Sequence, residues 1–177
     1  MMTSLPPEQL ADEARRLYQG GDFTAAAEAY GRAAEAYAAR PDALMAAEMR
    51  NNQAVSLLQA RQPQAALAAV QGTDLVFEQA GDLKRQGMAL ANLAGALEAL
   101  KRRKEAMECY RRAADVLEKA DEGDLRVEIM QLLAMDYLRR GKFFDAVLAL
   151  QSGMAGVKNP TPRQKLFKKL LFLRLWR

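Results

Sequence analysis

The chain has 177 residues, of which 50% are apolar, 34 are alanine and only 7% are aromatic, a composition that favours closely packed helices over strands. It has no histidine and a single cysteine, Cys109, which excludes Ser-His and Cys-His catalytic pairs, internal disulfides and the usual zinc sites. The net charge of +4 is uneven, because seven cations and no acid follow Asp145, which leaves residues 1–145 with a net charge of −3.

Apolar spacing and turn residues predict eight helices in four pairs. In chain order they cover 6–19 and 22–39, 42–60 and 63–80, 82–100 and 103–120, and 124–140 and 143–157. The pairs recur with a period of 40 residues, and small residues mark two fixed positions in each pair: Ala14, Ala54, Ala94 and Ala134, then Ala26, Ala66, Ala106 and Ala146. Small residues at such positions let two helix backbones approach closely.

Two segments carry a family resemblance: Gly21-Asp22-Phe23-Thr24-Ala25-Ala26 with Tyr30 and Ala33, and Asn92-Leu93-Ala94 followed by Lys104 through Tyr110 and Ala113. They resemble the tetratricopeptide repeat (TPR) family, and the 40-residue length is similar to the repeats of kinesin light chain adaptors. The resemblance implies an all-α fold, a TPR-like α-solenoid. Four helix-turn-helix repeats, at about 6–40, 42–80, 82–120 and 124–157, would form a right-handed superhelix within a domain 1–157.

The same resemblance implies that the first helix of each repeat lines a concave groove. The groove positions would hold Glu48, Asn51, Asn52, Met88, Asn92, Glu128, Gln131 and Met135 as peptide-binding residues. Asn52 and Asn92 would hydrogen-bond a peptide backbone, since an amide both donates and accepts; alternatively they are solvated helix residues or bond a neighbouring helix. Glu8, Asp12, Glu48 and Glu128 at the groove edge favour a neutral to basic segment.

Residues 158–177 are predicted to form a basic amphipathic C-terminal helix from Pro162 onward. It would cap the last exposed core face of the array. Alternatively Leu166, Phe167, Lys168, Lys169, Leu170 and Trp176 contact an anionic membrane or a partner, or the helix folds into the protein's own groove. Nucleic acid is the least supported ligand, because the body is net acidic and has no array of stacking aromatics.

These observations predict a non-enzymatic scaffold or adaptor that binds an extended or helical peptide segment of another protein. We expect no catalytic residues, no cofactor and no metal, and a buried, unreactive Cys109. The alternative is a peripheral membrane-associated adaptor or assembly factor attached through the basic C-terminal helix. The first residues lack the pattern of a secretory signal, so we expect a cytoplasmic protein, at the inner membrane surface in the alternative.

Overall fold

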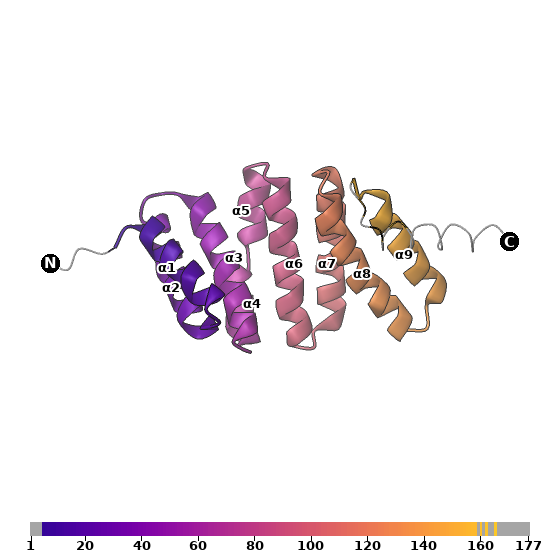
Figure 1. The fold of residues 1–177 in the computed structure, drawn as a ribbon, viewed down its shortest axis with the longest axis horizontal. Coiled ribbons are helices and arrows are strands. Elements are labelled where there is room, and N and C mark those ends of the chain that lie inside the picture. The colour runs from indigo at the N-terminus through magenta and orange to yellow at the C-terminus, as the bar shows by residue number, and fades with distance from the viewer. Residues whose placement is uncertain (1–4, 159, 161, 163–164, 166–177) are drawn as a thin grey trace.

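The computed structural model describes residues 5–158 together with 160, 162 and 165, and every regular element in that part of the chain is an α-helix. The helices are α1 (Pro7–Gln19), α2 (Phe23–Ala38), α3 (Ala43–Gln59), α4 (Pro63–Val70), α5 (Thr73–Gln79), α6 (Leu83–Ala99), α7 (Arg103–Lys119), α8 (Gly123–Arg139) and α9 (Phe143–Ala155). They stack as four hairpins along one elongated array (Figure 1). The all-α solenoid expected from the sequence is confirmed. Within the described residues no helix is long and apolar enough to cross a membrane.

Capping side chains set several of the helix starts. The carboxylates of Asp22, Asp42 and Asp82 each accept a hydrogen bond from the backbone N–H three residues ahead, at 3.0–3.1 Å. A proline occupies the first turn of α1 and of α4, where its missing N–H would have had no partner. Because these signals are local, seven of the eight predicted helices end within two residues of the observed ends.

The predicted continuous helix 63–80 is wrong, because the second helix of hairpin two breaks into α4 and α5. Gly72 adopts a left-handed conformation with φ of 82°, and Gln71 before it is extended. The Thr73 hydroxyl donates to the carbonyl of Val70 at 2.7 Å. Glycine reaches positive φ without a Cβ clash, and the threonine satisfies a carbonyl that the broken helix leaves open.

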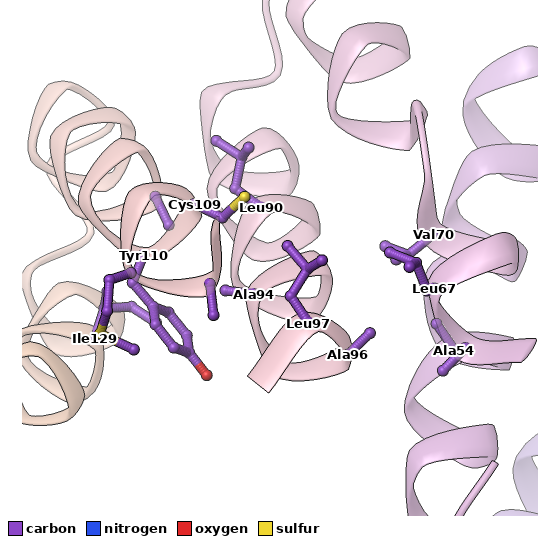
Figure 2. Packing of buried hydrophobic residues seen from close by; sticks show 14 of the residues in the cluster. Ala54, Leu67, Val70, Leu90, Ala94, Ala96, Leu97, Cys109, Tyr110 and Ile129 are labelled. Carbon is purple, nitrogen blue, oxygen red and sulfur yellow. The ribbon is translucent and has the colours of Figure 1, made fainter. Parts of the chain in front are cut away.

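The core runs along the array between the helix layers. The eight alanines at the two small positions are at most 1% exposed. Figure 2 shows Leu90 and Leu97 of α6 between Tyr110 of α7 and Leu67 of α4. Each hairpin therefore buries its apolar side chains against the next, so stability depends on neighbouring hairpins.

Six of the turns within and between hairpins share one geometry, with positive φ at Gly21, Arg61, Gly81, Lys101, Asp121 and Gly141. At the α6–α7 turn, for example, Lys101 N–H donates to Glu98 O and Arg102 N–H donates to Leu97 O, both at 2.9 Å. This is the left-handed C-terminal cap that reverses the chain tightly. Turns within a hairpin lie on one long edge of the array and turns between hairpins lie on the other (Figure 1).

Candidate functional site

The predicted groove residues lie on α3, α6 and α8, the first helices of hairpins two, three and four. We call the outward surface of these helices, together with α1, the first-helix face. Met88, Met135, Glu128 and Gln131 are exposed on it, Glu48, Asn52 and Asn92 are half-buried, and Asn51 is buried at 7% exposure. Seven of the eight residues can therefore reach a ligand, whereas Asn51 has little accessible surface.

Asn51 and Asn92 connect α3 to α6 through their side chains. Asn92 Nδ2 donates to Asn51 Oδ1 at 3.2 Å, and Asn51 Nδ2 donates to the carbonyl of Ala47 at 3.0 Å. The Asn51 amide thus uses both its oxygen and its nitrogen inside the protein. Asn92 keeps its own carbonyl oxygen and a second N–H for another partner.

Asn52 differs from these two residues. Its backbone carbonyl accepts the Ser56 hydroxyl at 2.9 Å, but its side-chain amide makes no hydrogen bond within the described part of the chain. The side chain is half-buried on the first-helix face. The side-chain N–H groups and the side-chain carbonyl of Asn52 are therefore both available to a ligand.

The acidic edge expected for the groove is largely paired. Glu48 Oε2 lies 2.9 Å from Arg85 Nη1, and Glu8 Oε1 lies 3.0 Å from Arg40 Nη1. Asp12 pairs with Arg15, also on α1. Glu128 forms no ion pair among the described residues. The negative potential of the first-helix face is thus weaker than the carboxylate count suggested.

Arg85 organises the start of α6. Its Nε lies 2.6 Å from Asp82 Oδ2, and its guanidinium lies 5.6 Å from the centre of the Phe77 ring. The backbone N–H of Arg85, with its guanidinium, holds the pKa of Asp82 below the usual carboxyl range. Spacing alone could not have revealed this network, which joins α3, α5 and α6.

Apolar side chains are the most accessible feature of the first-helix face in hairpins three and four. Met88 is 44% exposed, Leu132 is 41% exposed and Met135 is 51% exposed. Met88 and Asn92 are four residues apart on α6, and Leu132 and Met135 are three apart on α8, so each pair shares a helix face. Leu138 adds a fourth, at 44% exposure, and neither Leu132 nor Leu138 was among the eight predicted groove residues.

Cys109 is buried on α7, as expected. Burial raises the pKa of its thiol, which keeps it protonated and weakly nucleophilic. Beside it, Tyr110 donates its hydroxyl to Glu98 at 3.2 Å, and burial raises the pKa of that phenol. No group of three or more metal-ligating side chains occurs in the part of the chain that the structure describes.

Two buried carboxylates were missed by the sequence argument. Asp136 on α8 has a side chain only 4% exposed, which binds Arg103 Nε at 2.5 Å and Arg140 Nε at 2.9 Å. Asp74 on α5, at 8% exposure, pairs with Arg112 at 3.3 Å. Arg103 and Arg112 lie on α7, and Arg140 directly follows α8, so these ion pairs connect α7 to α8 and to α5 rather than form a ligand site.

The tail residues predicted to contact a membrane or partner, Leu166, Phe167, Lys168, Lys169, Leu170 and Trp176, lie outside the described residues. The described chain leads toward them through Val157, which packs on Val127 and Met154. Lys158 forms an ion pair with Asp121 of the α7–α8 turn. The tail therefore starts at the edge that holds the turns between hairpins.

Solved structures share this fold. The crystal structure of aspartyl phosphate phosphatase F from Bacillus subtilis matches with a TM-score of 0.77 at 16% identity, over 96% of this chain and 44% of that one. A Podosopora anserina putative kinesin light chain with nearly identical TPR-like repeats matches with a TM-score of 0.74 at 18% identity, over 98% of this chain and 88% of that one. The chain therefore spans less than half the length of the phosphatase. At these identities the matches show the fold, a TPR-like helical repeat.

No curated protein matches the sequence. The family model of the soluble NSF attachment proteins, SNAP, does match, over residues 8–152. That range runs from the first turn of α1 to the last turns of α9 and so includes all four hairpins. The chain belongs to the SNAP family of TPR-like helical repeat proteins.

Proposed function

We propose that this protein is a non-enzymatic adaptor that binds a segment of another protein on its first-helix face. The observation that carries the proposal is the exposure of Met88, Leu132 and Met135 beside the open amide groups of that face. Apolar side chains near amides that keep free donors and acceptors suit a peptide, whose side chains need apolar contacts and whose backbone needs hydrogen bonds. The family description, an attachment protein, supports a role in holding another protein.

The asparagines have different roles in this proposal. Asn52 offers both its donor and its acceptor to the peptide backbone, because its amide has no partner among the described residues. Asn92 offers its remaining groups, while Asn51 holds Asn92 in place through the 3.2 Å hydrogen bond. Replacing Asn92 would also leave the Asn51 oxygen unpaired, so Asn52 gives the cleaner test.

The ligand that fits best is a mainly apolar segment with neutral to basic flanks. Methionine side chains adapt to different apolar partners. Glu128 forms no ion pair in the described part of the chain, and it lies one turn before Leu132 on α8. A basic flank would therefore be attracted to α8, at the end of the face near Glu128.

Site-specific photo-crosslinking tests the proposal. A photoreactive residue at Met88 should capture a partner polypeptide in the native cell, and Met135→Glu in the same chain should abolish that capture. The matched control is a photoreactive residue at Leu75, which is 51% exposed but lies on α5, a second helix. Equal capture from Leu75 and Met88, or capture that survives Met135→Glu, would refute binding at the first-helix face.

A second candidate function is peripheral membrane attachment through the basic tail 158–177. The observation that favours it is the concentration of seven cations and no acid after Asp145. Basic amphipathic helices bind anionic bilayers through apolar burial and headgroup attraction. Co-sedimentation of the full chain with phosphatidylserine vesicles tests it, since Lys168→Glu/Lys169→Glu should abolish binding if the tail is the attachment site.

A further inference from the structure

One long edge of the array carries an excess of cations. This edge contains the turns within the hairpins, and we call it the hairpin-turn edge (Figure 1). In hairpins two to four it carries Arg61, Lys101, Arg102, Arg103, Lys104, Arg139, Arg140 and Lys142. The opposite edge carries Asp42, Asp82, Asp121, Glu122 and Asp124 together with Arg40, Lys84, Arg85 and Lys119. The hairpin-turn edge is therefore the more cationic of the two.

Several cations of the hairpin-turn edge remain available to a ligand. Arg102 pairs with Glu105, and the buried Asp136 binds two more arginines of this edge. Within the described residues Lys101 and Lys104 are exposed and form no ion pair. Lys142 lies 3.7 Å from Asp145 on the surface, a contact that contributes little.

Exposed aromatic residues occur at the end of the same edge. Phe143 is 59% exposed and Phe144 is 76% exposed at the start of α9, directly after the α8–α9 turn. Their rings contact each other edge to face, with centroids 6.2 Å apart. Leu148, one turn further along α9, is also 59% exposed. Three large apolar side chains thus project from the first two turns of one helix.

A further helix stacked on α9 would leave Phe144 and Leu148 exposed. Phe144 and Leu148 lie three and seven residues after Gly141, the left-handed residue of their turn. In the other hairpins the place of Phe144 is taken by Thr24, Gln64 and Lys104, and the place of Leu148 by Glu28, Ala68 and Glu108. All six are exposed, although another hairpin follows each of them. These places face outward in every hairpin. The fourth hairpin differs by having phenylalanine and leucine there.

The patch fits a surface better than a long partner helix. Beyond Leu148 the same face of α9 continues with Gln151 and Ser152, which are polar, so the apolar stripe ends after two turns. The apolar groups are instead concentrated at the edge, next to a row of cations. Aromatic side chains flanked by lysine and arginine suit the interface of an anionic bilayer.

We propose that the hairpin-turn edge docks on an anionic lipid surface. Phe143 and Phe144 enter the interface, and Leu148 follows at headgroup depth. Lys101, Lys104 and Lys142 contact the lipid phosphates and carboxylates. This site uses neither the first-helix face nor the tail, so it stands independently of the proposed peptide binding and of attachment through residues 158–177.

Vesicle flotation with the full chain tests the proposal. We expect binding to phosphatidylcholine vesicles that contain phosphatidylserine, weak binding to pure phosphatidylcholine, and loss of binding as salt rises. Phe143→Ser/Phe144→Ser should lower the partition coefficient about tenfold or more, because two apolar side chains no longer leave water. Both phenylalanines are exposed, so circular dichroism should show an unchanged fold. The matched control, Leu75→Ser, removes an equally exposed apolar side chain elsewhere and should not affect binding.

The charge contribution has its own pair of variants. Lys101→Glu/Lys104→Glu should lower binding to the anionic vesicles several-fold, since each basic residue near the surface adds headgroup attraction. Lys119→Glu, exposed at the opposite edge, should have a much smaller effect. An environment-sensitive dye on Phe144→Cys, in a Cys109→Ser background, should shift to the blue on vesicles. The same dye on Leu75→Cys should not.

Three outcomes would overturn the proposal. One is absence of binding to anionic vesicles by the full chain. Another is unchanged vesicle binding by the Phe143→Ser/Phe144→Ser variant. In that case attachment belongs to the tail if Lys168→Glu/Lys169→Glu abolishes binding, and to another surface if it does not. The third is equal loss in the matched controls, which would indicate nonspecific adsorption. Photo-crosslinking from Met88 is unaffected by any of these results, so the adaptor proposal is judged separately.

Discussion

Gly87 of α6 packs directly against Leu117 of α7, and replacing it should destabilise the protein. A Cβ at this position would lie 2.6 Å from Leu117 Cγ and 2.7 Å from Leu117 Cδ2. Leu117 is 1% exposed and has little room to move. Overpacking of this kind costs about 1–3 kcal/mol, and the gain in helix propensity from glycine to alanine is about 1 kcal/mol. We therefore expect Gly87→Ala to destabilise the fold by roughly 1 kcal/mol.

Two further variants make this reasoning sharp. At Gly95, also inside α6, the nearest atom to a Cβ is Leu58 Cδ1 at 3.7 Å, so Gly95→Ala should stabilise the protein by about 0.5–1 kcal/mol. In a Leu117→Ala background, which itself costs about 2–5 kcal/mol, Gly87→Ala should become stabilising. Urea denaturation followed by circular dichroism measures the free energy of unfolding of the wild type, the three single variants and the Gly87→Ala/Leu117→Ala double variant. If Gly87→Ala stabilised the wild-type chain as Gly95→Ala does, the close-contact argument would be wrong.

Four other variants test the turns, the caps and the buried charge. Both Gly141 and Lys101 have positive φ, where a Cβ is unfavourable. Gly141→Ala should therefore lower the free energy of unfolding by about 1 kcal/mol, whereas Lys101→Gly should leave it equal or slightly higher. Thermal melts compare the two variants. Asp82→Ala should cost about 1–2 kcal/mol at neutral pH. The pKa of Asp82 is lowered in the folded state, so its carboxylate stabilises the fold above the unfolded pKa of about 3.9. This stabilisation is lost as the pH falls through the folded pKa. The free energies of unfolding of wild type and variant, measured in urea, should therefore converge in acid. Asp136→Ala should cost about 2–4 kcal/mol in the same urea assay, because it leaves two arginines without their buried partner.

Most of the fold could be predicted from the sequence because its determinants are local. Capping aspartates, first-turn prolines and turn glycines mark the helix ends, and apolar spacing marks the buried faces. The break at Gly72 could not be predicted in this way, since a glycine inside an amphipathic pattern is also tolerated in a continuous helix. The left-handed Gly72 and the Thr73 hydrogen bond become visible only in three dimensions.

The candidate site was harder to predict because its contacts join residues far apart in the sequence. Asn51 and Asn92 were both selected, but their mutual hydrogen bond depends on the separation of α3 and α6. Glu48 was expected to attract a basic ligand, yet Arg85, 37 residues further on, pairs with it. Composition supplies the charges of a surface, and the fold decides which of them stay available.

The two proposed ligands can be held at the same time if the described array acts as a stiff rod. Met88 lies on a first helix, whereas Phe144 lies at the hairpin-turn edge of a second helix. The core cluster that includes α6 to α8 meets the cluster between α8 and α9 at Met130 and Tyr137, so we expect no joint that either ligand would bend. Two sites on a body that does not change shape have no coupling free energy. Photo-crosslinking from Met88 should therefore be equally efficient with and without anionic vesicles. A change of several-fold in either direction would contradict this independence and would place a flexible joint between hairpins three and four.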